Sequence, residues 1–198
     1  MVTAICLNAS NAGGRHLEKT LIVVKPDAVE RGLVGVFLAR FERMGMKIAG
    51  IKAISGERDV WEKFYPSDAV WLEHVGSLTA EDCRTRGFDL KAKYGTRNNR
   101  DIGLVVKARL VDHMSSGLAV AVVLIGIDCR TKVRITCGAT LPNKAAPGTI
   151  RFDFASDSPN RANDENRPLY NLIHASEPSE TRDDLAAADF EIDLIFGG

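Results

Sequence analysis

The fold of this chain is first indicated by residues 19–35, which have the sequence KTLIVVKPDAVERGLVG. The β-branched run at residues 19–25 ends at Pro26 and Asp27, so it predicts a buried strand that leads into a turn. Apolar residues then recur at the spacing of one helix face, at Val34, Phe37, Leu38, Phe41 and Met44. Residues 46–54 alternate apolar and polar side chains, as a half-exposed strand does. The stretch therefore predicts a strand–helix–strand unit of an α/β protein.

Further elements follow from apolar patterning in the middle of the chain. Residues 118–127, LAVAVVLIGI, form the most apolar run and predict a central strand that is buried on both faces. Residues 59–65 and 102–114 predict helices. Residues 67–100 are mostly polar and are interrupted by glycines, which predicts short helices and loops inserted between core elements.

The C-terminal part predicts a short strand followed by a helix and an extended end. Residues 171–176, NLIHAS, have the composition of a short strand. On a regular strand three side chains would share one face, those of Leu172, His174 and Ser176. Residues 180–188 predict a helix, and the alternation over 190–196 predicts a final strand or an extended tail.

The 198 residues predict one domain with additions rather than two domains. Residues 1–17 have no long apolar core and predict a flexible N-terminal extension. Residues 18–198 then form a single domain, in which the polar stretches at about 66–100 and 155–168 are insertions.

Composition excludes several classes of protein. A hydrophobic fraction of 45% is too high for a disordered chain, and 26 basic residues balance 26 acidic ones. This zero net charge argues against nucleic-acid binding through bulk charge. The four cysteines are scattered without a CxxC pair, which argues against structural zinc and favours reduced thiols in the cytoplasm. No apolar run approaches the ~20 residues that span a bilayer, so no membrane association is expected.

Cations gather in one segment despite the neutral balance. Residues 129–151 contain five cations and no acid, and residues 138–148 include glycines and prolines that shape an ordered loop. Such a segment suits polyphosphate binding, although a basic surface face is an equal alternative. Lys25, at the end of the first strand, is a candidate phosphate ligand, although alone it would be taken for a solvated lysine.

His174 is the most suggestive of the four histidines. It lies in NLIHAS between apolar residues and a serine. A neutral imidazole is a good nucleophile and general base near pH 7. On the residues alone, a buried structural histidine is the stronger interpretation.

Four motifs together resemble one known family. In chain order they are KTLIVVKPDAVERGLVG, HMSSGLAVAVV, GATLPNKAAPGTIR and NLIHASE, and they resemble nucleoside diphosphate kinase over about 18–58, 101–154 and 169–197. The resemblance implies an α/β (α+β) ferredoxin-like sandwich, in which helices cover a four-stranded antiparallel sheet, here with a helical insertion. It also implies transfer of the terminal phosphate of ATP to a nucleoside diphosphate by a ping-pong route through a phosphohistidine.

The resemblance also implies roles for individual residues. His174 matches the nucleophile, and Ser176 and Glu191 match residues that orient it. Phosphate and sugar contacts are implied for Lys25, Tyr65, Arg134, Thr140, Arg151 and Asn171. Val106 aligns where the family stacks an aromatic ring on the base. The Mg²⁺ cofactor is expected to be held through the nucleotide phosphates, near Glu177, with no direct protein ligand.

Two alternatives remain open at this stage. Phe152 and Pro178 depart from the family pattern, which leaves a catalytically weak nucleotide-binding or assembly module as an alternative function. The family forms homo-oligomers, so a hexamer, tetramer or dimer is expected, and the sequence does not decide among them.

Overall fold

The computed structural model describes residues 17–177 and 184–197. The chain divides into two compact units. Unit 1 comprises Met1–Ser55, Leu118–Ser156 and Asn171–Gly198, and unit 2 comprises Gly56–Gly117 and Asp157–Tyr170. The single-domain organisation stays a prediction.

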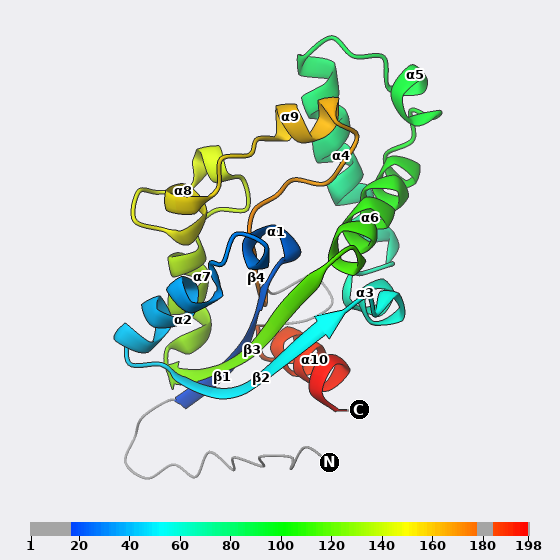
Figure 1. Ribbon diagram of the computed structural model, residues 1–198. Coiled ribbons are helices and arrows are strands. Elements are labelled where there is room, and N and C mark those ends of the chain that lie inside the picture. The colour runs from blue at the N-terminus through cyan, green and yellow to red at the C-terminus, as the bar shows by residue number, and fades with distance from the viewer. Residues whose placement is uncertain (1–16, 178–183, 198) are drawn as a thin grey trace. The chain divides into compact units, whose positions relative to one another are not determined.

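Unit 1 is built on one four-stranded sheet (Figure 1). Its strands are β1 (Leu17–Val24), β2 (Lys47–Ser55), β3 (Leu118–Ile127) and β4 (Ile173–Ala175). They lie in the order β2-β3-β1-β4, and every neighbouring pair is antiparallel. The predicted antiparallel sheet is confirmed, and β3 occupies a central position because its apolar run can be buried on both faces.

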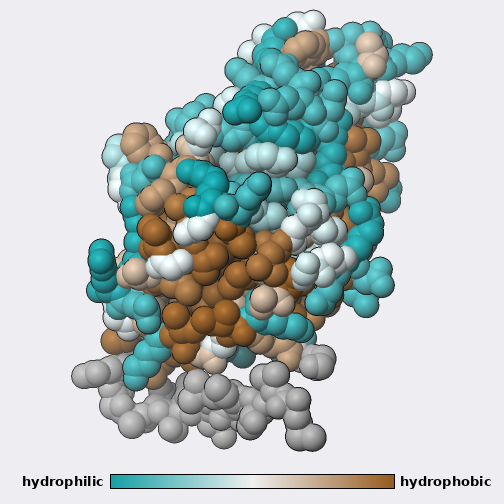
Figure 2. Space-filling model, in the orientation of Figure 1, coloured by the Kyte–Doolittle hydropathy of each residue, from teal (hydrophilic) through white to brown (hydrophobic). Residues whose placement is uncertain are grey.

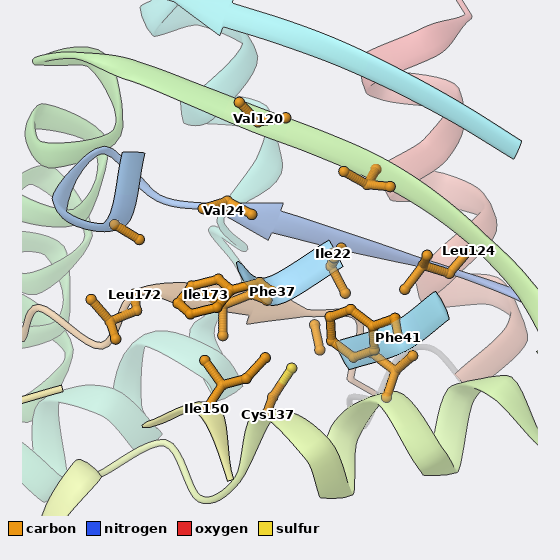
Figure 3. Packing of buried hydrophobic residues seen from close by; sticks show 14 of the residues in the cluster. Ile22, Val24, Phe37, Phe41, Val120, Leu124, Cys137, Ile150, Leu172 and Ile173 are labelled. Atoms are coloured by element: carbon orange, nitrogen blue, oxygen red, sulfur yellow. The ribbon is translucent and has the colours of Figure 1, made fainter. Parts of the chain in front are cut away.

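One face of the sheet packs against helices α2 (Val34–Arg43), α7 (Cys129–Cys137) and α8 (Ile150–Phe154). Phe37 and Phe41 are fully buried, since the helical spacing of the apolar residues of α2 directs both rings towards the sheet. Figure 3 shows these two rings and Cys137 on the same side of β1 as Ile22 and Val24. The short helix α1 (Pro26–Val29) directly follows β1 and carries the chain away from the strand end.

The other face of the sheet contacts helix α10 (Asp184–Phe196). The expectation of a strand or extended tail over 190–196 is wrong, because these residues belong to α10. Burial follows a helical period instead of alternation, at Ala187, Ala188, Glu191 and Ile195. The helix predicted over 180–188 is confirmed only from Asp184 onward, since 178–183 lie outside the described residues.

Strand β4 is shorter and less regular than the sequence predicts. Leu172 has φ of 72°, so the extended strand begins only at Ile173. Leu172 joins Ile173 and Ala175 in the core cluster, whereas His174 is paired with Val23 and faces the α10 side. The prediction that Leu172 and His174 share one face is therefore wrong, because the positive φ turns the chain between them.

Unit 2 consists of helices. They are α3 (Arg58–Phe64), α4 (Ala69–Thr85), α5 (Leu90–Tyr94), α6 (Asn99–Ser115) and α9 (Pro159–Asp164). Helix α4 is longer than the short helices predicted there, and it packs against α6 at Gly76 and Gly103. In the described residues, no helix combines the length and apolar character that crossing a membrane requires.

Candidate active site

The His174 side chain contacts the Glu191 carboxylate, which also binds Ser176. Its Nε2 atom lies 3.0 Å from Glu191 Oε1, and the other carboxylate oxygen of Glu191 accepts a hydrogen bond from Ser176 Oγ. Because His174 points to the α10 side of the sheet and α10 carries Glu191, the two meet across 17 residues of sequence. A carboxylate accepts a hydrogen bond only from a protonated ring nitrogen, so the neutral imidazole carries its proton on Nε2 and its lone pair on Nδ1.

Lys25 and Asn171 form a second group at the ends of β1 and β4. Lys25 Nζ donates to Asn171 Oδ1 at 2.7 Å, and Asn171 Nδ2 donates to the carbonyl oxygen of Thr140 at 3.0 Å. Lys25 is buried, and burial together with the nearby charge of Arg151 lowers its pKa to about 8. The Lys25 ammonium can therefore lose its proton near pH 8, and nearby charges shift the pH at which it does so.

Arg151 connects Gly138, directly after α7, to strand β4. Its Nη1 donates to the carbonyl of Gly138 at 2.6 Å, and its Nη2 donates to the carbonyl of Ile173 at 2.7 Å. Its Nε is buried without a partner among the described residues. Burial lowers the pKa of this guanidinium. A buried arginine with a donor to spare is a suitable partner for an incoming anion.

The acid-free segment predicted from the sequence, residues 129–151, comprises α7, the loop that follows it and the first residues of α8. Arg134 lies in the last turn of α7, and the exposed Thr140 follows two residues after Gly138. A 3₁₀ turn, η1 (Pro142–Lys144), shapes the middle of the loop. The Thr149 hydroxyl caps α8, the helix that carries Arg151.

One contribution to this loop was missed by sequence reasoning. Arg40 of α2 donates to the Gly148 carbonyl at 2.9 Å and also pairs with Asp153. The same carboxylate accepts the Gly148 backbone N–H at 3.0 Å, and the pairing with Arg40 lowers the pKa of Asp153. Arg40 is more than 100 residues from this loop in the sequence, so no local pattern could have indicated the contact.

Two predicted site residues, Tyr65 and Val106, lie in unit 2. Tyr65 follows α3, and its ring lies 5.5 Å from that of Phe64. Val106 packs against the cluster of Ala80, Cys83, Leu90 and Ile102. Neither is placed relative to His174, so their nucleotide contacts stay predictions.

Seven of the eight predicted residues of unit 1 take part in contacts around β4 and the end of β1, namely Lys25, Thr140, Arg151, Asn171, His174, Ser176 and Glu191. The eighth, Arg134, lies in the last turn of α7. His174 contacts Glu191, Lys25 contacts Asn171, and Arg151 bonds to the carbonyl of Ile173, the residue before His174. Such a site can accept a phosphoryl group on nitrogen while cations neutralise the charge of the phosphates.

Comparison with known proteins decides the family. The family model of nucleoside diphosphate kinase matches residues 18–71 and 92–197. The chain belongs to the nucleoside diphosphate kinase family. The resemblance noted in the sequence is thereby confirmed, and the match leaves out residues 72–91, which lie within α4, α5 and their connection.

Individual relatives agree with this membership. A nucleoside diphosphate kinase of Pyrobaculum aerophilum is 44% identical over 83% of this chain and 90% of its own. A crystal structure of an NDP kinase from Pyrobaculum aerophilum has a TM-score of 0.85 at 40% identity, covering 91% of this chain and 96% of that one. The nucleoside diphosphate kinase of Borrelia burgdorferi, solved as a transition-state mimic with vanadate and ADP, has a TM-score of 0.67 at 32% identity over 91% and 87% of the two chains. The ferredoxin-like fold expected from the family is confirmed.

Proposed function

We propose that this chain transfers the γ-phosphate of a nucleoside triphosphate such as ATP to a nucleoside diphosphate, through a phosphohistidine on His174. The proposal rests on the hydrogen bond between His174 Nε2 and Glu191, which directs the lone pair of the ring to Nδ1. Family membership and the Borrelia burgdorferi complex with ADP and vanadate support nucleotides as the substrates.

Two half-reactions make up the proposed cycle. In the first, His174 Nδ1 attacks the γ-phosphorus, the N–P bond forms, and the bond to the β–γ bridging oxygen breaks with its electron pair staying on the departing diphosphate. The Glu191 carboxylate stabilises the positive charge that develops on the ring, and Ser176 holds that carboxylate in place. A second diphosphate then attacks the phosphohistidine in the reverse sense, which regenerates the neutral imidazole.

The cations of the site are suited to the charge that the phosphates carry. Arg151 has an unpartnered buried Nε, and Lys25 is close enough for the charges to affect each other. Arg134, in the last turn of α7, and Thr140, in the loop that follows, are proposed to contact the phosphates together with the backbone amides of that loop. Asn171 is proposed to contact the sugar. Phosphoryl transfer depends mainly on such positioning and charge neutralisation.

The residues present suit a Mg²⁺ ion that arrives on the nucleotide. Burial lowers the pKa of both Lys25 and Arg151, and the charge of Glu177 opposes this lowering at both groups. This electrostatic influence supports a position of the Glu177 carboxylate near the phosphates that Arg151 and Lys25 are proposed to bind. Glu177 is exposed, so its negative charge would lie near the Mg²⁺ ion without a direct bond to it. When bound, Mg²⁺ supplies charge neutralisation to the phosphate oxygens.

A two-stage labelling experiment tests the function. The purified chain is incubated with Mg-ATP labelled at the γ-phosphate, freed of nucleotide, and then mixed with unlabelled CDP. We expect acid-labile label on the protein that moves to CTP, and we expect His174→Ala to take up none. A chain that binds nucleotide but acquires no acid-labile phosphate would establish the alternative of a binding or assembly module.

No observation in the described residues favours that alternative. Phe152 is 49% exposed on α8, and Arg151 beside it keeps its buried position and both carbonyl contacts. Pro178 lies outside the described residues.

Self-association and a cytoplasmic location complete the proposal. Strand β2 is the edge of the sheet, and its Ile51 is 54% exposed. Figure 2 shows apolar residues gathered over the part of unit 1 where Figure 1 places α2, β2 and β3. An exposed edge strand with apolar side chains is a template for pairing with a second copy, so we propose a homo-oligomer that uses this edge. The cytoplasmic location stays a prediction from the cysteine pattern.

A further inference from the structure

Leu172, which lies between Asn171 and strand β4, adopts a strained turn. Leu172 has φ of 72°, and the Ile173 backbone N–H donates to the Asn171 carbonyl at 2.8 Å across it. This is a γ-turn with positive φ, the rare and strained form. For a bulky residue such a conformation is an outlier that persists only where the surroundings enforce it.

The turn is held at three points. The Leu172 side chain is 1% exposed in the core cluster, where Figure 3 shows it beside Ile173. The Leu172 carbonyl accepts the Lys25 backbone N–H at 2.9 Å. The Leu172 backbone N–H donates to Asp27 Oδ2 at 3.0 Å. Since the sheet ladder begins only after this residue, the Asp27 carboxylate takes the place of a strand partner for the Leu172 amide.

The turn decides the directions of the two side chains that flank it. Before the turn, Asn171 reaches Lys25 Nζ and the Thr140 carbonyl. After the turn, Ile173 accepts from Arg151, and His174 faces Glu191. A regular strand at Leu172 would change the direction of Asn171 relative to His174, because successive side chains alternate along a strand.

We infer that Asp27 is a positioning residue of the phosphoryl-transfer site, which acts by holding the Leu172 γ-turn so that Asn171 and His174 are correctly placed. It works through hydrogen-bond acceptance by its side chain and not through contact with the nucleotide. The inference rests on the proposed function, because its effect is measured on His174 phosphorylation.

A plain structural role makes a different prediction. Asp27 lies in the first turn of α1, where a negative charge is favourable at any helix start. If only this charge mattered, Asp27→Asn and Asp27→Ala would have similar effects. If the acceptor holds the turn, Asn keeps an oxygen for the Leu172 amide and Ala does not.

The test measures the single-turnover rate of His174 phosphorylation at saturating Mg-ATP. We expect Asp27→Ala to slow this step about tenfold or more. The Leu172 amide would lose the hydrogen bond to its charged acceptor, and the loss of one such bond corresponds to a rate change of about tenfold. Asp27→Asn should restore the rate to within about threefold of the natural chain. Glu30→Ala, which removes an exposed carboxylate at the end of the same helix, serves as the matched control.

The outcomes separate the inference from the function beneath it. A folded Asp27→Ala variant that is phosphorylated at the natural rate overturns the inference and leaves the proposed function intact. An equal loss of phosphorylation rate in Asp27→Asn and Asp27→Ala also overturns the inference, because only the charge of Asp27 would then matter. If the Ala variant does not fold, Asp27→Glu, which keeps the charge but displaces the oxygens, takes its place: slow phosphorylation supports the inference and the natural rate contradicts it. Absence of phosphorylation in the natural chain refutes the proposed function itself.

Discussion

The buried ammonium of Lys25 is expected to make phosphate binding at the proposed site depend on pH. Burial, and next the charge of Arg151, lower its pKa to about 8 from the ordinary 10.5. Between these two values the unfolded chain binds more protons than the folded one, so the free energy of unfolding rises with pH across this window. The cost of burying the charged form is thus fully present below about pH 8. Phosphate binding has the opposite dependence, because it needs the charged form.

The affinity for ADP is therefore expected to fall as the pH rises through about 8. Above that value the loss approaches about tenfold per pH unit, and it ends where the pH reaches the higher pKa that Lys25 has beside bound phosphate. Calorimetric titrations between about pH 7 and about pH 9.5 measure it, with Lys25→Met as the comparison. The variant should bind weakly and lack the step near pH 8. The same step in both proteins would show that another group causes it.

We propose that the contact between Glu191 and His174 Nε2 decides which nitrogen of the ring is nucleophilic. In Glu191→Gln the amide can present an N–H to Nε2, which moves the ring proton to Nδ1 and removes its lone pair. We expect phosphorylation to slow about 100-fold or more, as in triads where the wrong tautomer is imposed. Rapid-quench kinetics of the first half-reaction measure this rate. An unchanged rate in a folded Gln variant would refute the tautomer argument.

Sequence reasoning found most residues of the site but not the contacts that hold them. Lys25, Arg151, Asn171 and His174 stand in recognisable motifs. The structure joins Lys25 to Asn171 and Arg151 to the strand that carries His174. The positive φ of Leu172 has no signature, because leucine gives no local indication of a turn. Asp27 reaches it across 145 residues.

At the scale of elements, the packing of α4 on α6 requires two glycines. A Cβ at Gly103 would lie 2.1 Å from the Leu72 carbonyl oxygen, and one at Gly76 would lie 1.8 Å from that of Asn99. Both contacts are to backbone, so the helices would have to separate.

Gly103→Ala is accordingly expected to lower the free energy of unfolding by about 3 kcal/mol, at the upper end of the usual cost of overpacking. Gly35→Ala in α2 is the matched control, because a Cβ there meets nothing within 4 Å and its φ is not positive. Alanine in place of that glycine should stabilise the helix by ~0.5–1 kcal/mol. Urea denaturation measures both. Similar effects at the two positions would show that the close approach of α4 and α6 does not matter.

The elements predicted most accurately are those in which apolar residues follow one clear pattern along the sequence. Strand β3 and helix α2 lie within one or two residues of the predicted ranges. The error at 190–196 arose because Phe190, Ile192, Leu194 and Phe196 alternate, whereas burial in α10 follows residues four apart. A short apolar stretch carries both periods, and only its contact with the sheet selects one.

At the scale of the whole molecule, the free edge at β2 predicts self-association. Ile51→Lys places a charge on this edge, and exposed residues seldom affect the folding of a single chain. We expect light scattering to show a smaller assembly for this variant than for the natural chain. Leu78→Lys, the same change at a 60% exposed position of α4, should leave the mass unchanged. A mass that responds to Leu78 and not to Ile51 would place the interface elsewhere.

The order of the strands is a property of the whole chain that no local pattern contains. β1 pairs with both β3 and β4, its neighbours in space but not in sequence. The sheet could be predicted because four separated motifs together resembled one family. The helical unit 2 follows no such motif over 72–91, and there the length of α4 was missed.

The most direct test of the account identifies the atom of His174 that carries phosphate. The chain, labelled with ¹⁵N and phosphorylated by Mg-ATP, is examined by ³¹P–¹⁵N correlated NMR. The account predicts a single phosphohistidine, at His174, with phosphorus bonded to Nδ1. Phosphorus on Nε2, on another residue, or absent altogether would contradict it.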